Sequence, residues 1–199
     1  MVVFANCFQM NQRQRRYIMK EVCQAQRTVI WFYAPGYSDG QRLHDAAMVS
    51  EITGMVLIEH SCSGPPEIIP VGGHQSFGVA KHVEPLFRLN DPAIEVLGYY
   101  AVSGAVGLAR QVYPGYTTIY SALPLRGAGL MRGLFKQAGA HIYDESGDVM
   151  LIDNQSLCLH SADGGQRRLK LRDGREIHIT MAPCSTVIID IATGKCVLS

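Results

Sequence analysis

Two segments of the sequence carry residue types that together could perform nucleophilic catalysis. Cys7 follows the apolar run 2–5 and precedes a predicted helix, while His82, Val83 and Glu84 place a carboxylate two residues after an imidazole. A thiol acts as a nucleophile in its thiolate form, which a nearby base produces at neutral pH. One hypothesis is therefore a small Cys-dependent hydrolase that uses Cys7 and His82.

The surroundings of Cys7 favour a structural role for its thiol. Its neighbours are Asn6 and Phe8, so the glycines that permit a strained nucleophile elbow are missing. His82 lies in the least regular part of the chain, where such a pair also arises by chance. We therefore expect Cys7 to be buried, with no imidazole within hydrogen-bond reach, and we predict no catalytic residue in this chain.

Residues after the second predicted strand are better candidates for ligand contact. The run 31–33 (WFY) and Tyr37 could stack on a sugar ring, although such residues more often fill a core. In the loop that follows, we predict that Tyr37, Ser38 and Asp39 contact a ligand. The acidic residues considered for a glycosidase pair are expected on solvated surfaces instead. They are Glu51, Glu59, Glu84 and Glu95.

The cysteines and histidines lack the spacing of a metal site or of a disulfide framework. The six cysteines contain no C-x-x-C pair, and no two of the seven histidines lie three or four residues apart. This spacing is typical of reduced thiols, so we predict neither a bound metal nor a cofactor. The cysteines are Cys7, Cys23, Cys62, Cys158, Cys184 and Cys196.

The composition is that of an ordinary globular protein. Of 199 residues, 47% are hydrophobic and 18% are charged, enough for a full core. A net charge of +1 argues against nucleic-acid binding by phosphate neutralisation, and Arg13, Arg15 and Arg16 are expected on a solvated helix face. No apolar run approaches the ~18 residues of a membrane span. We expect no leader before the first strand; the compartment stays unknown, with the cytoplasm favoured.

A strand–helix–strand unit begins the scaffold that must position these residues. Asn11 is a good helix N-cap, and Gln14 three residues later completes a capping box. The strand 28–34 is apolar on both faces, as in sheets that helices cover on both sides. Residues 1–34 therefore predict a right-handed βαβ unit with parallel strands, which we extend to an α/β layer over residues 1–145.

The remaining pattern changes from mixed elements to strands alone. A helix is predicted over residues 43–53, and prolines and glycines in residues 61–78 predict an irregular excursion or an edge hairpin. A further helix follows Pro124 to Ala138, and close packing on a sheet would explain its three glycines. Residues 146–199 alternate short strands with turns, which predicts a separate antiparallel β module.

The order of several segments resembles a known domain family. It is the glutamine-amidotransferase-like, β-galactosidase trimerisation-type domain, which occurs in the C-terminal half of family 42 β-galactosidases and related glycoside hydrolases. The closing segments resemble the small β-sandwich that ends such enzymes. The matching segments are residues 2–6, 28–40, 48–54, 90–92, 96–98, 118–122, 139–143, 148–160 and 190–194.

The resemblance implies a fold, a function and partners. The fold would be a flavodoxin-like, class I glutamine amidotransferase-like layer over residues 1–145, truncated at its N-terminus, with a β-sandwich over residues 146–199. In that family the glycosidase carboxylates lie on an upstream TIM barrel, so none is carried over. The implied function is a non-catalytic accessory and oligomerisation region of a glycoside hydrolase. Its partners would be copies of itself or the TIM-barrel domain.

Two alternatives remain open beside this interpretation. One is an amidotransferase-like hydrolase that uses Cys7 and His82. The other is a carbohydrate-binding module that uses the terminal β-sandwich.

Overall fold

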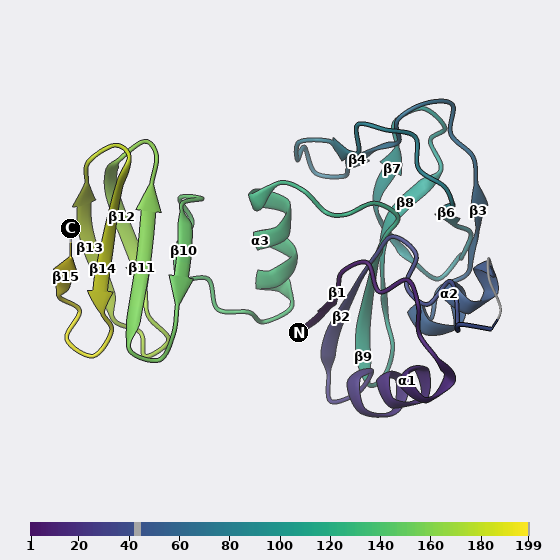
Figure 1. Ribbon diagram of the computed structural model, residues 1–199, viewed down its shortest axis with the longest axis horizontal. Coiled ribbons are helices and arrows are strands. Elements are labelled where there is room, and N and C mark those ends of the chain that lie inside the picture. The colour runs from purple at the N-terminus through teal and green to yellow at the C-terminus, as the bar shows by residue number, and fades with distance from the viewer. Residues whose placement is uncertain (42–44, 199) are drawn as a thin grey trace. The chain divides into compact units, whose positions relative to one another are not determined.

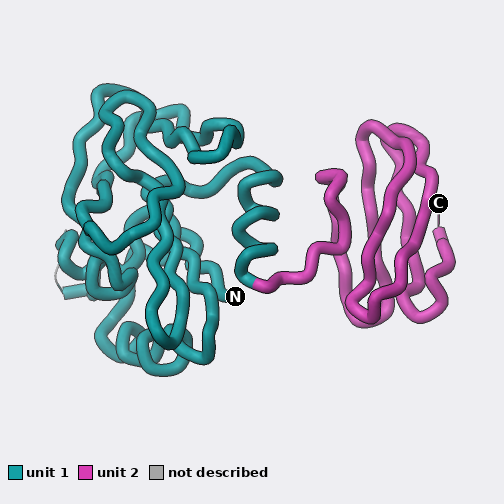
Figure 2. The backbone as a smooth tube through the Cα atoms, turned by 180° about the vertical axis from the view of Figure 1, so that it is seen from behind, with its two compact units in different colours: residues 1–138 teal, residues 139–199 magenta. Residues whose placement is uncertain are grey.

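The computed structural model describes residues 1–41 and 45–198 of the chain. It contains two compact units, Met1–Ala138 and Gly139–Ser199, which Figure 2 shows in separate colours. The domain boundary expected after residue 145 lies in the segment that connects the last helix of the first unit to the first strand of the second. Each unit is described by itself below.

The first unit is built mainly from strands, with short helices between some of them (Figure 1). The predicted helix at residues 43–53 is present from Ala46 onward, and its start at residues 43 and 44 lies outside the described residues. The elements in chain order are β1 (Val2–Phe4), α1 (Gln12–Tyr17), the π-helical turn η1 (Ile18–Val22), β2 (Arg27–Phe32), α2 (Ala46–Thr53), β3 (Leu57–His60), β4 (Glu67–Pro70), β5 (Phe77–Gly78), β6 (Leu86–Leu89), β7 (Glu95–Tyr100), β8 (Val106–Val112), β9 (Tyr116–Ser121) and α3 (Ala128–Gln137).

One curled mixed sheet organises this unit. Its strands follow the order β1-β2-β9-β8-β7-β4-β5, and the pair β3–β6 joins it through β8. The neighbours β1, β2 and β9 are parallel, whereas the other pairings are antiparallel. The prediction that the first two strands are adjacent and parallel is confirmed, with Val2 opposite Val29 and Phe4 opposite Trp31.

The predicted flavodoxin-like α/β layer is wrong. Strands account for 38% of the structure and helices for 15%, so helices are too few to cover both faces of a parallel sheet. A parallel sheet needs a crossover between successive strands, and α1 with η1 supplies one between β1 and β2. After β3, the chain instead returns through hairpins and loops, which gives antiparallel neighbours. The local strand–helix–strand pattern was correct, but it does not extend to the whole layer.

The first helix begins as its sequence predicts but places one arginine differently. Asn11 and Gln14 form the predicted capping box, each side chain accepting from the other's backbone N–H. Arg15, however, is only 5% exposed rather than solvated. Its guanidinium donates to the carbonyls of Met10 at 3.1 Å and Met48 at 2.8 Å, and also to that of Gly36. A buried cation needs such partners, and these backbone oxygens supply them.

The core of the first unit lies around the parallel strands. Trp31 is fully buried, its ring stacks on Phe4 at 4.4 Å, and its indole N–H donates to the Thr118 hydroxyl at 3.0 Å. That hydroxyl donates in turn to the Thr53 carbonyl at 2.8 Å, which ties α2 to β9. The polar atoms of this core are therefore paired, as burial requires.

The last helix of the unit buries Leu130 and Leu134. Close packing of its glycines was predicted, but a methyl group on Gly129 or Gly133 would meet no atom within 4 Å. That prediction is wrong because the glycines lie on an open face of α3. Among the described residues, no helix has the length and apolar composition that crossing a bilayer requires.

The second unit contains two antiparallel sheets and no helix in its described part (Figure 1). Leu157, Leu159 and Ile189 from the larger sheet form one core with Leu169 and Met181 from the smaller. Residues 2 apart face the same side of a strand, which explains the alternating pattern of the sequence. The strands are β10 (Val149–Ile152), β11 (Ser156–Ser161), β12 (Gly165–Lys170), β13 (Glu176–Met181), β14 (Ser185–Asp190) and β15 (Cys196–Leu198).

Candidate functional site

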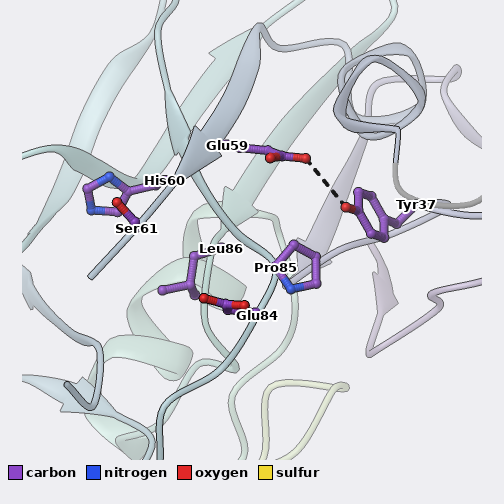
Figure 3. Close-up of a pocket in the computed structure, with 7 residues that line it drawn as sticks. All are labelled: Tyr37, Glu59, His60, Ser61, Glu84, Pro85 and Leu86. Atoms are coloured by element: carbon purple, nitrogen blue, oxygen red, sulfur yellow. Dashed lines mark hydrogen bonds between the residues drawn. The ribbon is translucent and has the colours of Figure 1, made fainter. Parts of the chain in front are cut away.

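A polar cavity of about 520 Å³ in the first unit is the candidate functional site (Figure 3). It combines two carboxylates, one imidazole and two hydroxyl groups, contributed by three separate segments. Such convergence of polar groups in a recess is typical of ligand sites. The lining residues are Tyr37, Glu59, His60, Ser61, Glu84, Pro85 and Leu86.

The pairing of two strands brings these segments together. On β3, Glu59 and His60 lie opposite Phe87 and Leu86 of β6, so the end of one strand meets the segment that leads into the other. Tyr37 comes from the loop after β2 and is only 3% exposed. Its ring is fixed edge-on between Phe8, at 5.3 Å, and Phe87, at 5.4 Å.

The hydroxyl of Tyr37 points toward Glu59, as Figure 3 shows, and donates to its Oε1 at 3.4 Å. Burial raises the pKa of Tyr37, and the nearby Glu59 carboxylate raises it further. Burial lowers the pKa of His60, and Arg88 adds to this effect. At neutral pH the cavity therefore presents a protonated phenol and a neutral imidazole beside its carboxylates. This set can exchange hydrogen bonds with hydroxyl groups of a ligand.

The three predicted contact residues have different surroundings. Tyr37 faces the cavity, but Ser38 is buried, and its hydroxyl accepts from the backbone N–H of Gly40 at 3.1 Å. Asp39 is half-buried, and its carboxylate accepts from the backbone of Gln41 at 2.8 Å. Ligand contact by these residues stays a prediction.

The sequence interpretation missed Glu59, His60 and Glu84 as parts of one site. Glu59 and Glu84 were assigned to solvated surfaces, and both are indeed exposed. Their shared cavity depends on the pairing of β3 with β6, which joins positions far apart in the sequence. The one local signal was an acidic residue followed by a histidine at the end of a short strand.

Cys7 and His82 are not joined in the described structure. Cys7 is partly exposed rather than buried, and its Sγ lies 3.7 Å from the Ala5 carbonyl oxygen. His82 is exposed and pairs with Glu84 at 2.9 Å, and this hydrogen bond raises the pKa of the imidazole. No described hydrogen bond or ion pair links the thiol to His82, so the arrangement offers no activated nucleophile there.

No group of three or more histidine, cysteine or acidic side chains suited to a metal ion occurs among residues 1–41 and 45–198. The carboxylates of the cavity are therefore considered as partners of an organic ligand.

Comparison with known proteins relates the chain to one class of enzymes through its fold. No protein-family model matches the sequence, and no curated protein does. A β-galactosidase from Bacillus circulans sp. alkalophilus matches 94% of the chain, with 13% identity and a TM-score of 0.63. One from the Antarctic haloarchaeon Halorubrum lacusprofundi also matches 94%, with 12% identity and a TM-score of 0.63. One from Rahnella sp. R3 matches 96%, with 12% identity and a TM-score of 0.59.

The match covers 32%, 30% and 32% of these three enzymes, respectively. At such identities the likeness concerns the fold alone. The chain therefore has the fold of one part of several β-galactosidases, and it spans about a third of their length.

Proposed function

We propose that this chain is a non-catalytic accessory region of a β-galactosidase-like glycoside hydrolase. In this role it holds subunits together, in the manner of a trimerisation-type domain, or forms a wall of the active-site cleft. The observation that carries the proposal is the fold likeness, which includes nearly the whole chain and about a third of each β-galactosidase. A region of this kind acts through its surfaces, so its edges and exposed apolar residues are the features to test.

The edge of the mixed sheet supports association with another chain or domain. Among the described strands, β1 pairs with β2 alone, so its other side presents unpaired backbone groups. Val3 on this strand is 38% exposed and Phe8 just beyond it is 37% exposed. Proteins seldom leave an apolar sheet edge bare, because it templates pairing with another strand. A second copy or the TIM-barrel domain of a parent enzyme would cover it.

The arrangement of the reactive groups also supports a non-catalytic role. Cys7 lacks a described imidazole partner, and Glu84 is paired with His82 at the surface. The alternative of a Cys-dependent hydrolase therefore receives no support from this geometry.

Turnover by the purified chain tests the non-catalytic part of the proposal. We expect no hydrolysis of a nitrophenyl β-galactoside and no release of ammonia from glutamine. The Cys7→Ser variant should behave as the unchanged chain does in both assays. Glutamine hydrolysis that Cys7→Ser abolishes would establish the thiol enzyme instead. Galactoside hydrolysis that Glu59→Gln or Glu84→Gln abolishes would place catalysis in this chain.

A further inference from the structure

We infer that a second cavity, of about 330 Å³, binds a single pyranose ring of a galactoside. The choice of ligand rests on the proposed function, because an accessory region of a β-galactosidase-like enzyme meets such sugars. The cavity itself is argued from its position, its backbone and its lining. The residues that carry the inference are Asn6, Phe8, Tyr33, Val79, Val83 and Leu123.

The cavity lies at the carboxyl ends of the three parallel strands. Asn6 and Phe8 follow β1, Tyr33 follows β2, and Leu123 follows β9. The Tyr33 N–H donates to the Ser121 carbonyl at 2.8 Å, so the ends of β2 and β9 are joined. In open sheets with parallel strands, ligands bind in the crevice outside these carboxyl ends. The sheet here is mixed, but its parallel part retains that geometry.

Two of the lining residues have an unusual backbone. Asn6 has φ of 54° and Tyr33 has φ of 67°, both in the left-handed region. Asparagine adopts this region more readily than most residues, whereas a bulky tyrosine there is a genuine outlier. Such conformations concentrate at ligand sites, where the surrounding structure imposes them. Both occur directly after adjacent parallel strands, and both side chains line the same cavity.

The lining matches the two chemical faces of a pyranose. Phe8, Val79, Val83 and Leu123 give an apolar wall against which the C–H face of a sugar can pack. The Tyr33 hydroxyl and the Asn6 carboxamide make no hydrogen bond to any other described residue, so both can bind sugar hydroxyls. Ligand cavities range from about 300 to 1,000 Å³, so this one suits a single ring.

The polar cavity lies directly beside this recess. Phe8 packs edge-on against Tyr37, which lines the polar cavity, and the chain neighbours Val83 and Glu84 line one cavity each. The Tyr33 phenol also contributes to the raised pKa of Tyr37, as two nearby acidic groups do. A substituent on the bound ring can therefore extend toward the carboxylates of Glu59 and Glu84.

Binding of methyl β-D-galactopyranoside to the full chain tests this inference. Affinity would be measured by saturation-transfer NMR and calorimetry for the unchanged chain and two variants. Tyr33→Phe removes one hydroxyl, and Asn6→Gly removes the carboxamide while suiting the positive φ. We expect roughly three- to tenfold weaker binding in each variant, the effect of one lost neutral hydrogen bond. Tyr99→Phe, on exposed β7, should bind as the unchanged chain does.

Three results would overturn the inference. They are no binding at millimolar sugar, equal binding by Tyr33→Phe and Asn6→Gly, and binding of indole in place of the sugar. Thermal unfolding of each variant would verify that it is folded. The outcome is separable from the proposed function, because sugar binding is measured on the isolated chain. A chain that associates with a galactosidase but binds no galactoside would remove this inference and leave the proposed function intact.

Discussion

At the residue scale, the position of Arg15 shows what local sequence cannot reveal. The sequence places Arg13, Arg15 and Arg16 on one short helix without distinguishing among them. Arg15 is buried because the carbonyls of Met10, Gly36 and Met48 converge on it from three segments. Those contacts depend on how the chain returns to α1, so a helical pattern alone cannot identify the buried arginine.

Replacing Arg15 with alanine should strongly destabilise the first unit. The change leaves three carbonyls without their donor and removes packed side-chain atoms, so we expect a loss of about 3 kcal/mol in the free energy of unfolding. Arg16→Ala on the exposed side of the same helix should change it by less than about 0.5 kcal/mol. Urea unfolding of both variants is the measurement. Equal effects would show that Arg15 is solvated after all.

The ion pair of Asp148 with Arg167 should make the second unit less stable in acid. A hydrogen bond from Arg167 is the main cause of a pKa for Asp148 below its ordinary value of 3.8. The pair therefore stabilises the folded unit above that value, and the contribution is lost as the pH falls below it. Asp148→Asn should be less stable at pH 7 and should lose less stability on acidification.

The exposed Asp163 provides the matched control for this pair. Asp163→Asn should retain the full acid dependence when urea midpoints are compared between pH 7 and pH 3. If Asp148→Asn and Asp163→Asn have the same pH dependence, the pair does not cause the acid sensitivity.

At the element scale, short-range signals were reliable and long-range pairing was not. The capping box at Asn11 and the parallel pair β1–β2 were predicted because each depends on a few neighbouring residues or one helix crossover. The flavodoxin-like layer failed because the chain between β3 and β9 contains strands whose partners lie far away in sequence. The candidate cavity was missed for the same reason, since Glu59 and Glu84 meet through the pairing of β3 with β6.

Two glycines with opposite surroundings test the placement of these elements. Gly133→Ala should stabilise the chain by about 0.5–1 kcal/mol, because the new methyl group meets no atom and alanine favours a helix. Gly107→Ala on β8 should destabilise it by about 1–3 kcal/mol, because its methyl group would lie 2.9 Å from Ile68 Cδ1. Thermal unfolding compares the two. Destabilisation by Gly133→Ala would mean that this face of α3 is packed.

At the scale of the whole molecule, the bare edge of the mixed sheet predicts self-association. A chain of 21.9 kDa with an unpaired β1 and exposed Val3 and Phe8 should form larger species as its concentration rises. Val3→Lys places a charge on that edge and should shift the mass toward the monomer. Val112→Lys, at an exposed site on β8, should leave the distribution unchanged. Light scattering during gel filtration gives the masses, and a 21.9 kDa species at every concentration would show that the edge is covered internally.

Association with a galactosidase in the native source is the most direct test of the proposed accessory role. Cell extract would be separated on a native gel, stained with a chromogenic β-galactoside and probed with an antibody against this chain. The proposal predicts that the antibody and the β-galactosidase activity mark the same band, whose mass exceeds that of the chain alone. Antibody signal confined to bands without galactosidase activity would contradict it.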